Sequence, residues 1–467
     1  MHPCGENITR NKPMSQSYSR FLTESASKSF DLHHRDLMNR HVSGYDEDVS
    51  VAREQFSNLE LAKKRAGHLR YMVLEHLEEH LKTFEQHFTN NGGRVIWAET
   101  ASDARKAILA FLQKGGAQTV VRSRSLLTEE IGLTGFLEKN GISCLDTGLG
   151  AHLLQITGDE PSHVTSPAMH LTASDAAASL HEKLGLHENA SPAEITDYVR
   201  KSLRKKLMQA DAAITGADFL LADTGSVAIS ENEGNAMMAM ATANLHVVVV
   251  GIDKVLGSVY DLDLFWPLLA TCGNGQQLYA YNTLVSGPKI REERDGPEQM
   301  VVVLVDNGRS RLLGTIPQRR SLACIDCGAC ANACPVFRTI GGHAYGSVYK
   351  GPIGAVVTPF LTGRFEEYKH LSFASTLCGH CSEVCPVGID LHHQLLMNRR
   401  FGVKNGYTSR AERWAMWAYR VGMKKRKRLD RFSPRRKNKL FKRFFAKGWG
   451  ERRERPMAVK SFASRYK

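Results

Sequence analysis

Outside one short segment, this chain of 467 residues has very little cysteine. Of its ten cysteines, only Cys4, Cys144 and Cys272 lie outside residues 324–385. A disulfide-stabilised secreted protein would spread its cysteines along the chain, so this distribution favours metal ligation in a reducing compartment. The sequence has no run of 18 apolar residues, and residues 1–13 lack the apolar segment of a secretory signal. We therefore expect a cytoplasmic protein that does not span a membrane.

Nucleotide-binding motifs are also absent. The sequence contains no P-loop, and no G-x-G-x-x-G motif follows a predicted strand. Nothing in it therefore marks a flavin or nicotinamide site.

The positive charge is confined to the C-terminal part of the chain. Residues 401–467 hold 23 Lys and Arg against 4 Asp and Glu, a net charge of +19. The remaining residues hold 39 Lys and Arg against 44 Asp and Glu, a net of −5. Aromatic residues interleave with the basic runs 424–428 and 435–437, which suits docking to a partner or to an anionic membrane surface. No nucleic-acid-binding motif accompanies them, so nucleic acid is the least favoured partner.

Two cysteine runs carry the clearest chemical signal. The first is CIDCGACANACP at 324–335, and the second is CGHCSEVCP at 378–386. The C-x2-C-x2-C-x3-C-P pattern is typical of ferredoxins, in which the fourth cysteine of each run ligates the cluster of the other run. Zinc is the competing interpretation because paired C-x-x-C elements also build zinc sites, but seven cysteines in two Cys-Pro-ended runs fit zinc poorly.

The crossing rule assigns seven ligands to two iron–sulfur clusters, most simply [4Fe-4S]. The first cluster takes Cys324, Cys327, Cys330 and Cys385, and the second takes Cys334, Cys378 and Cys381. A complete second run would have a cysteine at position 375, which is Ser375. Ser375, water or a partner group are the candidates for the fourth ligand, and a three-iron centre is the alternative.

Residues 1–55 are polar, serine-rich and aperiodic, which predicts an extended arm. Apolar residues at helical spacing predict a helix over 56–87. Beyond it, short β-prone runs alternate with helical segments, one of which opens with the capping box Ser191-Pro-Ala-Glu194. This alternation predicts a mainly parallel α/β sheet. The expected strands lie at 94–97, 118–121, 142–145, 219–222, 226–229, 246–250 and 301–306.

Loops of this sheet contain polar groups of possible functional interest. Residues 122–125, RSRS, follow a strand and open a helix, as in an anion site. The acidic loops 223–226 and 231–235 suit either general acid/base chemistry or, as we favour, turns that need glycine and asparagine. His163 and His170 lack metal-binding spacing, so we predict that both form hydrogen bonds in a loop.

Several stretches together resemble the lactate utilization protein B family, the iron–sulfur subunit of a three-part bacterial L-lactate dehydrogenase complex. The most specific are GGHAYGSVY at 341–349 and GPIGA at 351–355, and the others are 121–131, 158–163, 212–216, 231–235, 286–288 and 304–310. The resemblance extends from about Ala62 to the C-terminus. It implies a ribose-phosphate isomerase/CoA-transferase-like sheet domain of the LUD type at 56–315. An α-helical two-cluster ferredoxin-like domain at 316–400 and a basic extension at 401–467 would follow.

The same resemblance implies a function in electron transfer. The chain would relay electrons from a partner subunit that oxidises L-lactate to pyruvate to a downstream acceptor, with no catalytic residue of its own. One alternative is the iron–sulfur subunit of a glycolate-type hydroxy-acid oxidase. Two others are an enzyme that uses the incompletely ligated iron as a Lewis acid, and a redox-responsive binding protein that uses the basic extension.

Overall fold

The computed structural model describes residues 15–425 and 433–449. Residues 13–402 form one compact unit, and the residues from 403 onward belong to a second. All seven cysteines of the two runs lie in the first unit. Cys4 and residues 426–428 of the first basic run lie outside the described residues.

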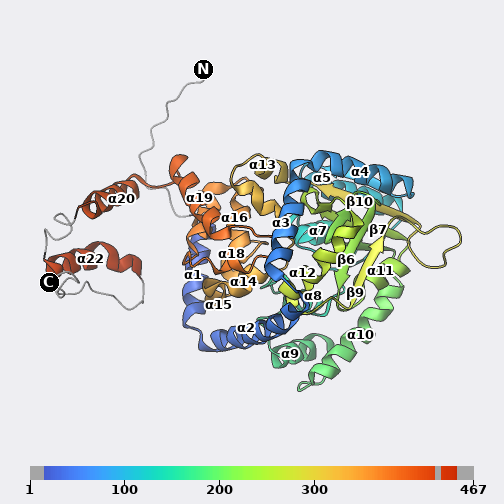
Figure 1. Cartoon of the computed structure of the whole chain (residues 1–467). Coiled ribbons are helices and arrows are strands. Elements are labelled where there is room, and N and C mark those ends of the chain that lie inside the picture. The colour runs from blue at the N-terminus through green and yellow to red at the C-terminus, as the bar shows by residue number, and fades with distance from the viewer. Residues whose placement is uncertain (1–14, 426–432, 450–467) are drawn as a thin grey trace. The chain divides into compact units, whose positions relative to one another are not determined.

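A six-stranded sheet, parallel throughout, forms the centre of the larger unit (Figure 1). Alternate residues of its central strands face different cores, with Val247 and Val249 on one side and Val248 and Val250 on the other. Burial on both faces explains why these strands read as continuous apolar runs. In spatial order the strands are β1 (Arg94–Ala98), β10 (Gln299–Val305), β7 (Leu245–Gly251), β4 (Ala212–Thr215), β2 (Thr119–Arg122) and β3 (Ser143–Asp146).

Helices cover both faces of this sheet, as the alternating pattern predicts. One face packs against α5 (Ala101–Lys114), α6 (Leu126–Glu130) and α7 (Leu133–Lys139). The other packs against α3 (Leu59–Glu75), α4 (Leu77–Asn90) and α11 (Asn235–Thr242). The single helix expected over 56–87 is therefore two helices. A third core packs α11 against α8 (Leu149–Thr157), α9 (Ala173–Leu184) and α10 (Pro192–Met208). The capping box predicted at Ser191 is confirmed and begins α10.

A second, four-stranded sheet was not predicted. Its order is β8 (Val255–Leu256), β5 (Phe219–Leu221), β6 (Ser226–Glu231) and β9 (Tyr281–Val285). The runs at 219–222 and 226–229 form an antiparallel hairpin in this sheet and are not strands of the parallel sheet. Only four residues separate β5 from β6, too few for the crossover that a parallel pair requires. The helix α12 (Leu262–Asn274) follows β8 in the chain.

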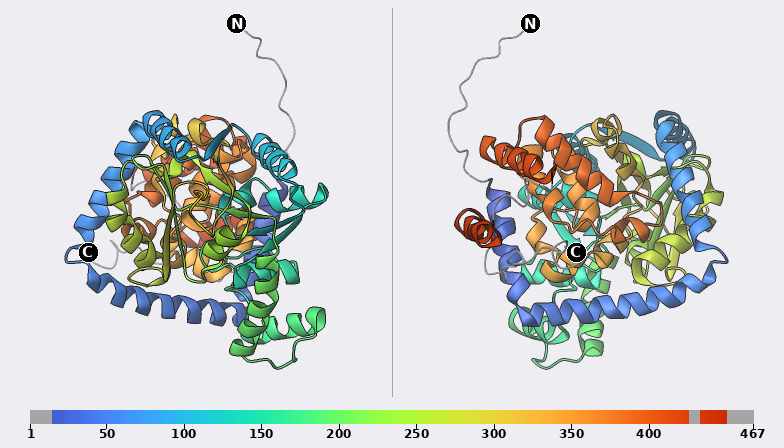
Figure 2. Two further views of the ribbon diagram at one scale, coloured as in Figure 1. Left: turned by 90° about the vertical axis from the view of Figure 1, so that its right-hand side faces the viewer. Right: turned by 60° about the vertical axis from the view of Figure 1, so that its left-hand side comes forward.

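The prediction of an extended N-terminal arm is wrong for residues 16–52. They form α1 (Gln16–Phe30) and α2 (Leu32–Ala52), which we call the N-terminal strap. Both views of Figure 2 show α2, in blue, along the lower edge of the molecule. The strap packs on α12 of the sheet domain and on two helices late in the chain, α15 (Pro335–Ile340) and α17 (Phe365–Tyr368). Its buried apolar residues, Leu37, Met38, Val42 and Val49, occur at helical spacing between polar residues.

The two cysteine runs lie in a small helical domain that follows α13 (Arg309–Leu313). Its central helix, α16 (Gly351–Leu361), is formed by the glycine-rich connection between the runs, and every residue of α16 is buried. The other helices are α14 (Ala329–Ala333), α15 (Pro335–Ile340), α17 (Phe365–Tyr368), α18 (His380–Glu383) and α19 (Leu391–Lys404).

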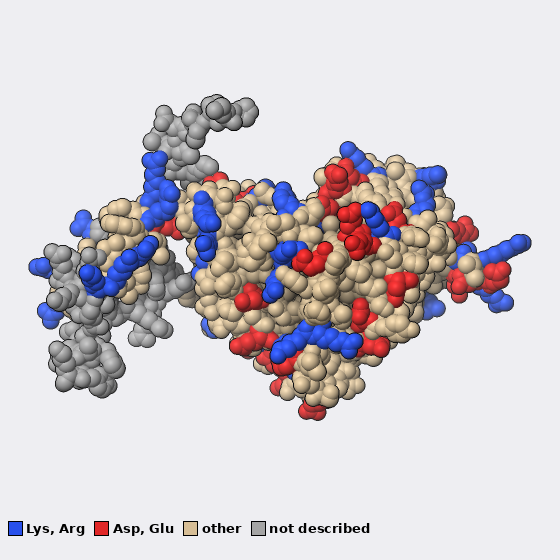
Figure 3. Space-filling view, turned by 45° about the horizontal axis from the view of Figure 1, so that its top comes forward, with Lys and Arg blue, Asp and Glu red and all other residues tan. Residues whose placement is uncertain are grey.

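The second unit contains α20 (Arg410–Met423) and α22 (Pro434–Trp449). Trp414, Trp417 and Tyr419 of α20 are all exposed. Among the described residues, none of the helices is apolar over a length that would cross a bilayer. On the face of the molecule drawn in Figure 3, acidic and basic side chains are interspersed over the larger unit.

Candidate metal centre

Each cysteine run turns sharply at a glycine that has left-handed backbone geometry. Gly328 (φ 78°) follows Cys327, and Gly379 (φ 89°) follows Cys378. A residue that carries a Cβ atom is strained in this backbone conformation, so glycine suits both positions. The glycines are the N-caps of α14 and α18. These two short helices pack against each other and bring the cysteines of the two runs together.

Four thiols enclose one small cavity. Cys324, Cys327 and Cys330 of the first run line it together with Cys385, the last cysteine of the second. Cys327 also interacts electrostatically with Cys324 and Cys385. All except Cys324, which is half-buried, are buried. The structure thus places together the four residues that the crossing rule assigned to the first cluster.

The remaining three cysteines form a second group at the surface. Cys334 interacts electrostatically with Cys378, and Cys381 interacts with both. Cys378 is exposed, whereas Cys334 and Cys381 are buried. Cys330 of the first group interacts with Cys334 and Cys381. The two groups are therefore neighbours, the first enclosed by protein and the second reaching solvent.

Backbone amides point at the sulfur atoms. The Ile389 N–H donates to Cys385 Sγ over 3.3 Å, and the Asp326 N–H donates to Cys324 Sγ over 3.4 Å. Burial raises the pKa of the Cys385 thiol, while N–H donors and the charge of Lys63 lower it. Ligating sulfur must be deprotonated, and such donors stabilise the thiolate. Seven soft sulfur donors in two adjacent groups fit two iron–sulfur clusters.

Buried and half-buried charged residues tie the first cysteine group to the sheet domain. Lys254, which follows β7, forms an ion pair with Asp326 (2.8 Å) and donates to the carbonyl of Cys324 (2.8 Å). Lys254 also pairs with Asp253, which pairs in turn with Arg309 at 2.7 Å. The positive charges of Lys254 and Arg309 outweigh burial and lower the pKa of Asp253 to about 2.

The network continues into the motif between the cysteine runs. Arg309 forms a second ion pair with Glu130 (2.9 Å), and the Tyr349 hydroxyl donates to the same carboxylate over 2.5 Å. Tyr349 is the last residue of GGHAYGSVY and also lines the cavity between the four thiols. Sequence reasoning assigned no role to Lys254 and Arg309, because only the fold brings them to the cysteines. Three of the stretches that carry the family resemblance, 121–131, 304–310 and 341–349, meet in this contact through Glu130, Arg309 and Tyr349.

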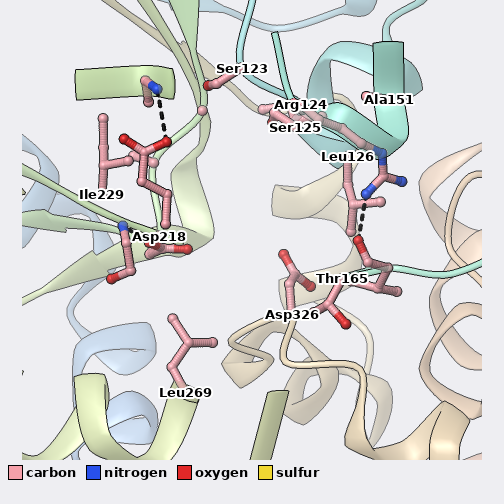
Figure 4. Close-up of a pocket in the computed structure, with 18 of the residues that line it drawn as sticks. Ser123, Arg124, Ser125, Leu126, Ala151, Thr165, Asp218, Ile229, Leu269 and Asp326 are labelled. Atoms are coloured by element: carbon pink, nitrogen blue, oxygen red, sulfur yellow. Dashed lines mark hydrogen bonds between the residues drawn. The ribbon is translucent and has the colours of Figure 1, made fainter. Parts of the chain in front are cut away.

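A cleft of about 380 Å³ opens at the carboxyl ends of the parallel strands (Figure 4). Leu126, Ile325, Asp326 and Tyr349 line both this cleft and the thiol cavity, so the cleft adjoins the first cysteine group. Asp218 faces the cleft, and burial raises its pKa to about 6 against hydrogen bonds from Ser230. The position fits the rule that α/β sheets bind ligands beyond the carboxyl ends of their strands.

The predicted anion site at 122–125 is only partly available. Arg122 is buried and forms a bidentate pair with Asp146, with Nε and Nη2 at 2.7 and 2.8 Å from the carboxylate oxygens. Arg124 lines the cleft but pairs with Glu129 at 2.8 Å. The helix that begins after Ser125, α6, is only five residues long. Most of the positive charge expected for an anion is therefore already neutralised.

The acidic loop at 231–235 and the two histidines have the structural roles that we favoured. Glu231 accepts hydrogen bonds from the Ala236 and Met237 amides at the start of α11, both over 2.8 Å. Glu233 accepts from the Leu149 amide of α8 over 2.9 Å. His163 Nδ1 lies 3.3 Å from the Thr165 and Ser166 amides, and His170 Nδ1 lies 3.0 Å from Ser162 Oγ.

Two family models match this chain, one in each domain. The LUD domain matches residues 81–305, and the 4Fe-4S dicluster domain matches residues 320–389. The second match confirms the prediction of iron–sulfur clusters and sets aside the zinc interpretation. A crystal structure of a DUF162-family protein from Deinococcus radiodurans aligns with 49% of this chain and 98% of its own at 17% identity. Its TM-score of 0.26 is too low to support a structural argument.

Curated relatives match across both domains. The chain is 40% identical over 393 residues to lactate utilization protein B of Bacillus velezensis, covering 83% of this chain and 82% of the relative. It is 41% identical over 372 residues to lactate utilization protein B 2 of Bacillus mycoides, covering 79% and 78%. With its sheet domain and its dicluster domain both in place, the chain belongs to the lactate utilization protein B family.

Proposed function

We propose that this chain is the iron–sulfur electron-transfer subunit of a multi-subunit complex that oxidises L-lactate to pyruvate. The observation that carries the proposal is the arrangement of the seven thiols in two adjacent groups, one enclosed and one at the surface. Iron–sulfur clusters supply one-electron oxidation and reduction. An enclosed centre beside an exposed one suits a relay through the protein.

The ligand sets follow from the two groups. Cys324, Cys327, Cys330 and Cys385 would hold the first cluster, and Cys334, Cys378 and Cys381 the second. The ion pairs of Lys254 fix the loop of the first set against the sheet domain. The exposed side of Cys378 would face the partner with which electrons are exchanged.

The oxidation of lactate itself belongs to a partner subunit. Removing a hydride requires a two-electron acceptor, whereas a cluster exchanges one electron at a time. The sequence contains no motif for a flavin or a nicotinamide. The role of this chain is then to receive electrons already separated by the partner and to pass them to a downstream acceptor.

A dye-reduction assay tests this division of labour. We expect the anaerobically reconstituted chain to reduce an artificial dye with L-lactate only when the candidate partner subunits are added. Replacing L-lactate by glycolate in the complete mixture tests the related hydroxy-acid oxidase. Dye reduction by this chain alone, at the rate of the complex and abolished by Cys381→Ser, would contradict the relay. It would instead favour chemistry at the second centre.

The basic extension contributes a docking segment in this proposal. It combines a net charge of +19 over residues 401–467 with the exposed aromatic side chains of α20. This combination suits a partner subunit or the anionic inner face of a membrane. The chain would then act in the cytoplasm, either within the complex or on the membrane surface.

A further inference from the structure

The two cysteine runs have the same spacing if Ser375 is counted with the second. Each of Cys324, Cys327, Cys330 and Cys334 has a counterpart 51 positions later, at Ser375, Cys378, Cys381 and Cys385. Pro335 and Pro386 keep the same offset. Only the first position differs, where the first run has a thiol and the second has a hydroxyl.

The backbones of the two runs agree as well. Only three non-glycine residues in the described part of the chain have a positive φ, namely Asn307, Asp326 and Leu377. Asp326 and Leu377 are counterparts, and both have a φ of 56°. This conformation is rare for leucine and is retained only where the surroundings impose it. The second run therefore repeats the turn of the first, although its first residue is serine.

The side chain of Ser375 occupies the place of a ligand within this turn. Ser375 Oγ accepts a hydrogen bond from the Leu377 N–H over 3.1 Å. In the first run, Cys324 Sγ accepts the equivalent bond from the Asp326 N–H over 3.4 Å. Cys324 lines the thiol cavity from this position. By the repeat, Ser375 Oγ occupies the first ligand position of the second group, which otherwise has three thiols.

Arg399, a half-buried residue of α19, holds the loop around Ser375 in position. Arg399 Nε donates to the Ser372 carbonyl over 3.0 Å, and Arg399 Nη2 lies 3.5 Å from the Ser375 carbonyl. The same guanidinium lies over the ring of Phe373, 4.7 Å from its centroid. Three contacts from one side chain fix the backbone on both sides of Phe373. Ser375 is therefore presented by an anchored loop.

We infer that Ser375 Oγ is the fourth protein ligand of the second cluster. On binding, the hydroxyl proton passes to solvent and an iron–oxygen bond forms, displacing a water from that iron. Oxygen is a harder donor than sulfur, so the second centre has a mixed ligand set and the first an all-thiolate set. The inference rests on the proposed assignment of Cys334, Cys378 and Cys381 to one cluster.

Thiol protection tests the position directly. Ser375→Cys and the matched control Thr376→Cys, at the exposed next residue, would be made in the full chain and loaded with clusters anaerobically. Treated with iodoacetamide while loaded, the thiol introduced by Ser375→Cys should be protected and the control thiol alkylated. Equal alkylation of both introduced thiols in fully loaded protein would overturn the inference.

Iron retention gives a second, independent measurement. On mild oxidation with ferricyanide, Ser375→Ala should lose iron from the second cluster roughly tenfold faster than the wild type, while Thr376→Ala behaves as the wild type. Iron loss from Ser375→Ala at the wild-type rate would also overturn the inference. Cys378→Ala separates the two proposals, because alanine offers no ligand and retention of all iron by that variant would refute the cluster assignment itself, whatever Ser375 does.

Discussion

At the scale of single residues, Cys327 offers the sharpest test of the ligand assignment. A second buried cysteine, Cys272, interacts electrostatically with Cys327 but does not line the thiol cavity. We expect Cys327→Ala to lose about half of the iron, because removal of one thiolate from a buried cluster destabilises it directly. Cys272→Ala should keep its full iron content. Iron and sulfide analysis with electron paramagnetic resonance checks both, and an unchanged iron content in Cys327→Ala would refute the assignment.

Arg70 connects the two domains through hydrogen bonds to carbonyl groups. It is completely buried and donates to the carbonyls of Val255 (2.7 Å), Leu322 (3.1 Å) and Asp253. Arg70→Met would leave these acceptors without a donor, at a cost of about 1–3 kcal/mol each. We therefore expect a loss of several kcal/mol in the free energy of unfolding, measured by thermal or denaturant unfolding of the loaded protein. Arg65→Met, at an exposed position of the same helix, is the control and should change little.

Asp218 makes stability depend on pH. Burial raises its pKa from 3.8 to about 6, so the folded protein holds this proton more tightly than the unfolded chain. Ionisation therefore costs stability as pH rises from about 4 to about 6, and the full cost persists above that window. Asp218→Asn removes the cost. The variant should melt at a higher temperature than the wild type at pH 8, with a smaller difference at pH 5. An equal difference at both pH values would contradict the proposed origin.

At the scale of elements, the spacing of the cysteines predicted their grouping because the ferredoxin-type turn is a local structure. Turns set by Gly328 and Gly379 depend on residues within each run. The N-terminal strap was missed for the opposite reason. Its apolar residues are few, and α2 is helical because those residues find partners on α12 and α15, far along the chain. Such tertiary packing outweighs a weak local pattern.

The buried charges could not be predicted by any local rule. Lys254 and Arg309 look like surface residues in the sequence. Arg309 is buried and Lys254 is half-buried because Asp253, Asp326 and Glu130 lie around them. The hairpin β5–β6 shows the same limit, because its apolar residues resemble those of the parallel strands. What distinguishes it is the short connection, a signal that the sequence did contain.

The helices α20 and α22 can be removed without touching any of the seven cysteines. All of these cysteines lie in the compact unit 13–402. We expect a chain truncated after Ser409 to keep the full iron content and to lose association with the partner subunits or the membrane fraction. Co-purification at low and moderate salt measures the association, with the full-length chain as control. Loss of the clusters on truncation would show that the extension is part of the core.

At the scale of the whole molecule, the larger unit contains a cleft, an enclosed thiol group and an exposed thiol group, and each adjoins the next in space. The cleft adjoins the first group through Leu126, Ile325 and Tyr349, and the first group adjoins the second through Cys330. The sheet domain thus serves as the support on which the dicluster domain is fixed. Arg70 and Lys254 are among the residues that join them.

The strap has a consequence for how the protein is made. At its start, the hydroxyl groups of Ser15 and Ser17 donate hydrogen bonds to the carbonyl of Glu367, which lies about 350 positions later in the chain. At roughly 5–20 residues per second, the ribosome needs on the order of 20–70 s to add those positions. During that time α1 and α2 are synthesised, but α15 and α17, on which they also pack, are still incomplete. Because Cys378, Cys381 and Cys385 follow Glu367 in the chain, all seven thiols are present only after the residue that receives the start of the strap has been made.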